Sequence, residues 1–431
     1  MAGTVTQAKP MHGQDAARLR WLFLDLNSYF ASVEQQENPR LRGKPVIVTP
    51  VASDATCAIA ASYEAKAFGI RTGTPVYEAK RLCPGLRIVP ARHDIYVEYH
   101  HCIVDEIERH LHVTKVESID EVACELLGAE RKTENAVALA REVQQGILKE
   151  AGECMRSSVG LAPSVLLAKT ASDMKKPAGL TVLGADKLPE AILPLGLEDF
   201  CGIGRNIKRH LQVAGVCDVA TLWALSPSRA RAIWGSIGGE RFWYALHGID
   251  PPEIATHRQT IGHSHVLGPA LRNRYAGYRV ARRLLARAAA RLRRAEHKAG
   301  RLVLWLRLSG EGTRECAERF SHTADTFSLL CALDRLWNAI VTPSERLPVK
   351  HVGIHLLDLI PTAEIAPDLF GWTPDLGERP ERLRLSQAID RLNQRYGVDT
   401  VSIGTAPPGL PGYMGAKIAF NRIPERQDFS G

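Results

Sequence analysis

The sequence predicts a multidomain α/β protein, and three observations support this prediction. The chain has 431 residues, about three times the usual length of one domain, so several domains are expected. Short apolar runs typical of buried strands alternate with stretches whose apolar residues follow helical spacing. The net charge is +8 and the pI about 9.0, which favours a polyanionic partner.

The first half of the chain predicts a sheet backed by helices. Residues 1–19 show no apolar period and are expected to form a mobile leader. The predicted strands are Trp21–Leu26, Pro45–Thr49, Leu86–Val89, Val113–Ser118, Val122–Leu126 and Ser157–Leu161, and the predicted amphipathic helices are Val97–Leu111 and Asn135–Glu150. This order favours a mixed α/β domain around a mainly antiparallel sheet.

The second half predicts a helical module and then a further α+β unit. Short helices begin near Ala191, and a linker is predicted near Pro251–Gln259. The later elements are an arginine-rich helix at Tyr275–His297, a strand at Leu302–Leu308, a helix at Ser328–Ile340, a strand at Val349–Ile360 and a helix at Leu385–Tyr396.

Composition excludes several classes of protein. A hydrophobic content of 45% and a charged content of 24% are ordinary for a globular protein and exclude a fibrous or wholly disordered chain. No stretch approaches the roughly 18 apolar residues of a membrane span, and the N-terminus lacks the apolar middle of a signal peptide, so a cytoplasmic protein is expected. The nine cysteines form no CxxC pair, which argues against a disulfide framework or a structural zinc site.

Three acids are the strongest candidates for chemistry. Asp25 ends an apolar strand, and Asp120 and Glu121 lie between two predicted strands. Carboxylates gathered in space repel one another unless cations neutralise them, and hard oxygen ligands favour Mg²⁺. Two such ions about 3.5–4 Å apart support phosphoryl or nucleotidyl transfer. Spacing alone leaves a solvated acidic turn open as the alternative.

Four motifs carry a family resemblance. They are DLNSYFASVEQ at Asp25–Gln35, SYEAKAFGI at Ser62–Ile70, SIDEV at Ser118–Val122 and GLAPSVLLAKTASDMKKPAGL at Gly160–Leu180. In this order they resemble the Y-family translesion DNA polymerases, from about Trp21 to Ile360. Asn27 and Lys66 stand where the DNA polymerase IV branch usually has Asp and Arg. These two residues are more similar to the UmuC-type catalytic subunit of DNA polymerase V, as is LNQRYGVDTV near the C-terminus.

The resemblance implies a right-hand polymerase fold. The implied parts are an α/β palm at 20–190 with small fingers inserted at about 36–93, a helix-hairpin-helix thumb at 191–253, an α+β little finger at 260–361 and a tail at 362–431. The implied activity is template-directed, error-prone DNA synthesis past lesions, with two Mg²⁺ ions, in DNA repair and the SOS response to DNA damage.

The resemblance also assigns site residues. Asp25, Asp120 and Glu121 are the implied catalytic acids and metal ligands, with the Leu26 carbonyl as a further ligand. Ser28, Tyr29 and Phe30 begin a helix whose free N–H groups suit a triphosphate. Phe30 corresponds to the steric gate that excludes a 2′-hydroxyl, with a core aromatic as the alternative. Tyr63, Lys66 and Lys176 resemble the residues that contact the phosphates.

Two basic segments are expected to bind DNA. CGIGRNIKRHLQVAGV is a helix-hairpin-helix candidate, in which Gly202 and Gly204 permit a tight turn and Arg205 and Lys208 add charge. An ordinary Gly-capped helix is the alternative. In the arginine-rich helix, Arg279, Arg283 and Arg287 are assigned to DNA phosphates, because Glu296 is the only acid in that segment. A merely solvated helix face is the alternative there.

Partners follow from the same resemblance. Primer-template DNA and dNTP are the implied substrates. Leu369 and Phe370, in APDLFGW, are similar to peptides that dock in the sliding clamp, although the usual leading Gln is absent and a tether packed on the protein itself stays open. UmuC-type enzymes act with SOS accessory proteins, namely a processed subunit and a recombinase filament. The alternative function is a non-catalytic DNA-binding accessory of the same fold, against which the presence of the three acids argues.

Overall fold

The computed structural model describes residues 19–250, 252, 259–310, 312–341, 348–364, 379–397, 399–404 and 423. These residues fall into two compact units: residues 19–250, 252 and 423 belong to the first, and the described residues of 259–404 belong to the second. The predicted leader lies outside the described residues except for Leu19, which is buried in the core of the first unit. Most of the predicted linker near Pro251–Gln259 also lies outside them. None of the described helices is long and apolar enough to cross a membrane.

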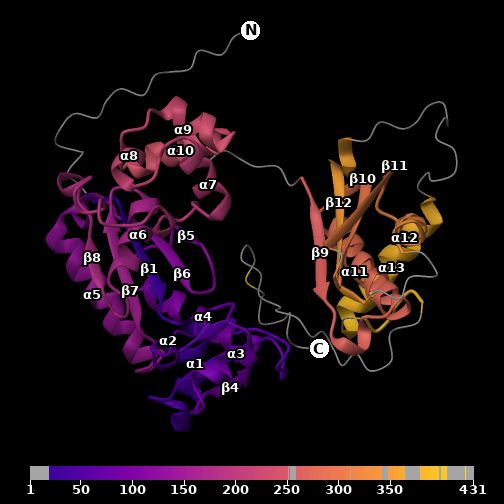
Figure 1. The fold of residues 1–431 in the computed structure, drawn as a ribbon, viewed down its shortest axis with the longest axis horizontal. Coiled ribbons are helices and arrows are strands. Elements are labelled where there is room, and N and C mark those ends of the chain that lie inside the picture. Colours follow the sequence, from indigo (N-terminus) through magenta and orange to yellow (C-terminus); the bar gives the residue numbers. More distant parts are fainter. Residues whose placement is uncertain are drawn as a thin grey trace. The chain divides into compact units, whose positions relative to one another are not determined.

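The first unit is built around a five-stranded sheet with the strand order β5-β6-β1-β7-β8 (Figure 1). Its strands are β1 (Trp21–Leu26), β5 (Lys115–Val116), β6 (Glu121–Glu125), β7 (Ser157–Ala162) and β8 (Leu180–Val182). Every neighbouring pair is antiparallel except β7 and β8. The mainly antiparallel sheet is therefore confirmed, while β8 was not predicted.

Helices cover both faces of this sheet. In the part of the first unit that contains this sheet, the helices are α1 (Tyr29–Glu37), α4 (His93–Glu108), α5 (Thr133–Glu150) and α6 (Val165–Met174). Leu22 and Leu24 of β1 pack in the core that includes residues of α4 and α5, whereas Trp21 and Phe23 pack in the core that includes α6. Because successive side chains of a strand alternate between faces, Asp25 points to the same face as Phe23.

Two smaller parts complete the first unit. Between α1 and α4 lies a three-stranded sheet of order β3-β2-β4, with a core of its own around Ile47 and Ile70. Its elements are β2 (Val46–Thr49), β3 (Ala60–Ala61), β4 (Arg87–Pro90), α2 (Tyr63–Lys66) and α3 (Val76–Leu82). After β8 come four short helices, namely α7 (Arg205–Val213), α8 (Val219–Trp223), α9 (Pro227–Trp234) and α10 (Ile237–Leu246).

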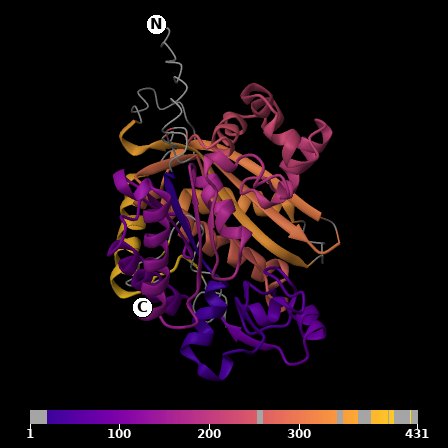
Figure 2. The same ribbon diagram turned by 90° about the vertical axis from the view of Figure 1, so that its left-hand side faces the viewer.

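The second unit is a four-stranded antiparallel sheet of order β11-β10-β12-β9, with helices on one face (Figures 1 and 2). Its strands are β9 (Ile261–Val266), β10 (His297–Leu308), β11 (Gly312–Thr323) and β12 (Val349–Pro361), and its helices are α11 (Arg274–Arg294), α12 (Thr326–Ile340) and α13 (Pro380–Tyr396). The helix predicted at Tyr275–His297 ends three residues earlier in the structure, at Arg294. Glu296 adopts a left-handed φ of 55°, and His297 already begins β10.

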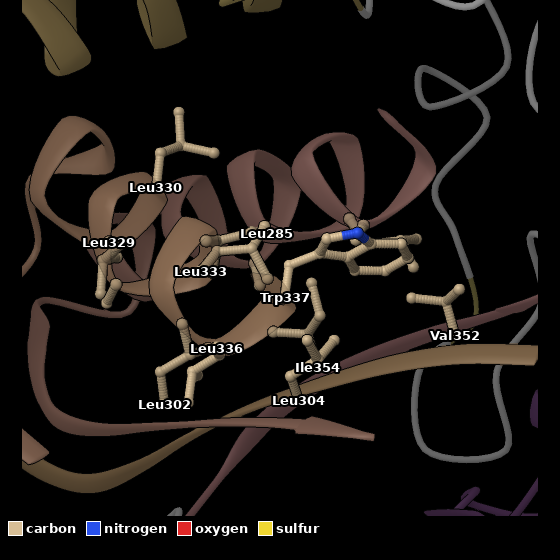
Figure 3. Packing of buried hydrophobic residues seen from close by; sticks show 14 of the residues in the cluster. Leu285, Leu302, Leu304, Leu329, Leu330, Leu333, Leu336, Trp337, Val352 and Ile354 are labelled. Atoms are coloured by element: carbon tan, nitrogen blue, oxygen red, sulfur yellow. The ribbon is translucent and has the colours of Figure 1, made fainter. Parts of the chain in front are cut away.

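The core of the second unit lies between the sheet and its helices. Leu302 and Leu304 of β10 and Ile354 of β12 pack against Leu333 and Trp337 of α12 (Figure 3). The alternate residues of these strands point to the other face, over which no described helix of the second unit lies. This open face contains Trp305. Its indole lies so close to Gly353 of β12 that a Cβ on residue 353 would be only 2.0 Å from the ring.

Candidate active site

The three predicted acids lie at neighbouring ends of β1 and β6. Asp25 is paired with Glu121 in the register of the two strands, and the backbone N–H of Leu26 donates to the carbonyl of Asp120 at 2.8 Å. The hydrogen bonds of the sheet thus bring together acids that are about a hundred residues apart in the sequence.

Each of these carboxylates has its own partner. The Lys176 ammonium lies 2.6 Å from Asp25, and the Lys169 ammonium donates to both oxygens of Glu121 at 2.8 and 2.7 Å. Asp120 accepts a hydrogen bond of 2.6 Å from the Ser118 hydroxyl. Within the described ranges, no three His, Cys, Asp or Glu side chains are gathered as a metal site would gather them. The lysines supply the positive charge that the acids need.

Electrostatics at Asp25 favour a cation. Burial raises the pKa of Asp25 to about 7 against the opposing charge of Lys176, and the neighbouring Asp120 and Glu121 add to the rise. Burial acts to lower the pKa of Lys176, but Asp25 and Asp173 outweigh it and raise this pKa above its ordinary value. The ionised form of Asp25 is therefore poorly stabilised, and a further cation beside it would stabilise that form strongly.

Lys169 is a site residue that sequence reasoning missed. It lies on α6 within a quoted motif, yet its role depends on the packing of α6 across the sheet. Its ammonium also lies 5.5 Å from the ring centroid of Phe23, so Phe23 and Glu121 together fix it. Lys169 is therefore a positioning residue for Glu121.

Replacing Lys169 by Met is expected to lower the free energy of unfolding by about 1–2 kcal/mol, because Glu121 loses two charge-assisted hydrogen bonds. Urea unfolding of the purified chain measures this loss. Lys208→Met is the matched control, since Lys208 forms a more exposed pair with Glu198 that is worth at most about 0.5–1 kcal/mol. Equal losses in both variants would contradict the assignment.

The Asn27 side chain forms hydrogen bonds to two other segments of the first unit. Its Nδ2 donates to the Ser158 hydroxyl at 3.0 Å, and its Oδ1 accepts from the backbone N–H of Ala178 at 2.7 Å. Asn27 thereby connects β1 with β7 and with the segment that carries Lys176. This hydrogen-bonding role was not evident from the sequence.

The start of α1 departs in part from the expectation. Ser28 adopts a left-handed φ of 51° before the helix begins, and its buried hydroxyl has no hydrogen-bond partner among the described residues. Tyr29 was predicted to contact the nucleotide, but its buried hydroxyl donates to the Tyr96 carbonyl at 2.6 Å. Only the backbone of Tyr29 is left for a nucleotide.

Phe30 is held in one orientation by an aromatic neighbour. Its ring stacks on Tyr96, with 4.5 Å between the centroids and 20° between the planes. Tyr96 is itself buried and donates to Glu34 at 2.7 Å. A ring supported in this way cannot easily turn aside from a bulky ligand.

Tyr63 and Lys66 of α2 form a second basic position next to Asp25. The Lys66 ammonium lies 4.3 Å from the ring centroid of Tyr63. Burial lowers the pKa of Lys66, and the charge of Lys176 lowers it further against the effect of Asp25. Burial also raises the pKa of Tyr63, on which Lys176 and Asp25 act as well. Lys66 and Lys176 therefore act on the same small region around Asp25.

The predicted hairpin turn is present before α7. Gly202 has a φ of +95°, which favours glycine, whereas Gly204 has an extended backbone with free space around its Cα. Only the first glycine is thus required by the backbone. Arg205 is exposed, and Gly204 and Arg205 line a shallow hollow. Lys208 instead forms an ion pair of 2.7 Å with Glu198.

The arginines of α11 have internal partners that the sequence did not predict. Arg283 and Arg287 both bind Asp399, at 2.8 and 2.7 Å, and these two arginines lower the pKa of Asp399 although burial opposes them. Arg279 lies 5.5 Å from the ring centroid of Tyr275. Glu296 is the only acid in the sequence segment, but the fold brings Asp399 beside Arg283 and Arg287. Their assignment to DNA phosphates stays a prediction.

The open face of the second sheet carries its own positive charge. In the strand register, this face holds Trp305 together with Arg301, Arg307 and Arg319. Its acids are Glu315 and Asp358, and the Asp358 carboxylate lies 3.9 Å from the Arg319 guanidinium. Two histidines, His351 and His355, contact the Trp305 ring at centroid distances of 4.6 and 6.5 Å. This arrangement of cations and an aromatic on an uncovered sheet suits a polyanion.

The proposed clamp residues Leu369 and Phe370 lie outside the described residues, so their role stays a prediction. The same holds for the SOS accessory proteins.

Comparisons with known proteins extend this picture. The impB/mucB/samB family matches residues 24–173, and the C-terminal domain of that family matches residues 258–369. DNA polymerase IV of Moorella thermoacetica is 34% identical over 396 residues, which cover 87% of this chain and 93% of that protein. DNA polymerase IV 1 of Bacillus subtilis is 30% identical over 393 residues, which cover 88% and 91%.

A solved structure shows the same fold. A chimera of the Y-family DNA polymerases Dbh and Dpo4 superposes with a TM-score of 0.65 at 23% identity, covering 79% of this chain and 99% of the chimera. The predicted fold is confirmed. The finer likeness to the UmuC-type subunit stays a prediction, because both relatives above carry the name DNA polymerase IV. Two matching family models and a relative matched over nearly its whole length show that the chain belongs to the impB/mucB/samB family, the Y-family DNA polymerases.

Proposed function

We propose that this protein is an error-prone DNA polymerase that copies DNA past lesions. In the proposed reaction, the primer 3′-hydroxyl oxygen attacks the α-phosphate of the incoming dNTP. The new phosphodiester bond forms as the bond to the β-phosphate oxygen breaks, the hydroxyl proton is released, and pyrophosphate leaves. The observation that carries the proposal is the strand pairing that sets Asp25 opposite Glu121 and bonds the Leu26 N–H to the Asp120 carbonyl, which brings the backbones of the three acids to neighbouring strand ends.

The donor set of the site fits divalent cations. Asp25, Asp120 and Glu121 offer hard carboxylate oxygens, and the pKa of Asp25 is raised by burial and by the other two acids, as expected where a cation is needed. These three acids, with the Leu26 carbonyl, would hold two Mg²⁺ ions. When bound, the ions would supply charge neutralisation at the α-phosphate and the leaving group. Lys169 would keep Glu121 in place, and Lys176 would exchange its contact with Asp25 for one with phosphate.

The nucleotide would lie between α1 and the two basic positions. The charge of Lys176 lowers the pKa of Lys66, so a triphosphate that neutralises both lysines would bind well. The unpartnered hydroxyl of Ser28 and the first backbone N–H groups of α1 offer further donors. Tyr63 and Phe30 would line this proposed nucleotide position. Extension of a labelled primer by the purified chain with Mg²⁺ and dNTP tests the whole proposal, and a chain that binds primer-template DNA but never extends it would support the accessory alternative.

The DNA contacts proposed here differ from those expected from the sequence. The turn at Gly202 with exposed Arg205 is kept as a phosphate contact. In the second unit, we favour the open sheet face over Arg283 and Arg287, because these two arginines already neutralise Asp399. Arg279 stays a predicted contact.

A salt series distinguishes the two surfaces. Exchanging Arg301, Arg307 and Arg319 together for Gln is expected to reduce the slope of log affinity against log salt by roughly 2–3, at about 0.9 for each lost phosphate contact. The control is the double variant Arg283→Gln, Arg287→Gln, which should keep the slope but lower thermal stability. Fluorescence anisotropy with a primer-template duplex gives both slopes. If only the double variant Arg283→Gln, Arg287→Gln showed a reduced slope, the DNA contact would be assigned to α11 and not to the open sheet face.

A further inference from the structure

Helix α13 presents an apolar seam that no described part of the second unit covers. Leu385, Ile389, Leu392 and Tyr396 follow one another at intervals of four, three and four residues, which places them along one side of the helix. Leu385, Leu392 and Tyr396 are 50%, 42% and 61% exposed. Large apolar side chains in such a line are typical of an interaction surface.

The opposite side of α13 is fixed to the second unit, where α13 lies beside α11 and α12 (Figure 1). Asp390 accepts hydrogen bonds of 2.7 and 2.8 Å from Arg293 of α11. Ser386 is buried and accepts from the backbone N–H of Thr326 at 3.2 Å, and Leu383 packs on the core. The seam is therefore held facing outward by a docked helix.

Electrostatics beside the seam are positive. Arg384, Arg391 and Arg395 are exposed, and each directly precedes a seam residue, so the three form a parallel row on the same helix. The only acids of α13 are Glu381 and Asp390, and Asp390 is already paired with Arg293. The Arg395 guanidinium lies 5.3 Å from the Tyr396 ring centroid, which joins the row to the seam.

We propose that α13 docks an acidic amphipathic helix of a partner protein. Alternating four- and three-residue spacing is the pattern by which one helix packs its apolar side against another. The arginine row requires acidic residues opposite it. A second copy of this chain would bring arginines into the same interface, and nucleic acid would leave the apolar seam exposed to water. The helix lies beyond residue 369, where the family's C-terminal domain match ends, so this surface is additional to the proposed polymerase function.

The probe is a labelled synthetic helix of about three heptads with Ile and Leu in its seam and Glu beside it. A matched peptide carries Lys in place of each Glu. Fluorescence anisotropy with the full-length chain is expected to show binding of the acidic peptide and binding at least about tenfold weaker for the basic one. The double variant Leu385→Ser, Leu392→Ser should lose about tenfold or more in affinity. Tyr275→Ser, which alters an equally exposed aromatic on α11, should lose none.

Charge reversal provides the decisive variant, because it leaves the packing of α13 intact. Arg384→Glu with Arg391→Glu should switch the preference to the basic peptide while primer extension stays unchanged. Equal binding of both peptides, or binding unaffected by the leucine substitutions, would overturn the proposal. So would a concentration-dependent dimer in sedimentation that the leucine variant abolishes, or an equal loss of DNA affinity in that variant.

Discussion

Replacing Asp120 by Asn is expected to lower the rate of primer extension by about a thousandfold or more. Loss of one carboxylate from the proposed cation site removes several kcal/mol of transition-state stabilisation, and each 1.36 kcal/mol corresponds to a factor of ten. The substitution preserves side-chain shape, so the Ser118 hydroxyl can still donate to the remaining oxygen. Single-turnover extension with Mg²⁺ and saturating dNTP measures the effect.

The matched control is Asp173→Asn. Asp173 also binds Lys176, at 2.7 Å, but its side chain is 45% exposed and it lies outside the group of three acids. This variant should lose less than about tenfold, the range of an exposed ion pair. Both variants should bind primer-template DNA as the parent does, because phosphate contacts are separate from the chemistry. Near-normal extension by Asp120→Asn would refute the proposed role of the acids.

The sequence was most informative where a residue's surroundings are local. β1 could be predicted because WLFLDL is apolar on both faces, as required of a central strand packed between two helical layers. Asp25 then follows as the one charged residue of that strand. The pairing of Asp25 with Glu121 was accessible only through the family motifs, since strand pairing across such a separation leaves no periodic signal.

Other features could not be predicted because their partners come from distant segments. β11 has no apolar run, and its exposed positions hold Thr313, Glu315 and Arg319, so its sequence looks like a loop. The α11 helix looked unopposed in charge, but Asp399 reaches it from more than a hundred residues away. Ion pairs of this kind engage residues that the sequence assigns to a binding site, and the local sequence around those residues gives no sign of it.

Replacing Phe30 by Ala is expected to raise the use of ribonucleotides relative to deoxynucleotides by roughly tenfold to a hundredfold. A steric clash with one added group costs about 1–3 kcal/mol, and the stack of Phe30 on Tyr96 keeps the parent ring from moving away. Removing the ring opens space for the 2′-hydroxyl, while dNTP use should fall less. Incorporation of matched rNTP and dNTP on one template gives the ratio.

Tyr29→Phe is the control for this prediction because it changes the adjacent aromatic. Its hydroxyl bonds the Tyr96 carbonyl, so its loss should lower stability by about 1 kcal/mol and leave sugar selection alone. An unchanged ratio in Phe30→Ala would mean that the ring is a core aromatic, the alternative that the sequence left open. A rise in both variants would instead assign selection to the Tyr96 platform, since Tyr96 is the neighbour that the two residues share.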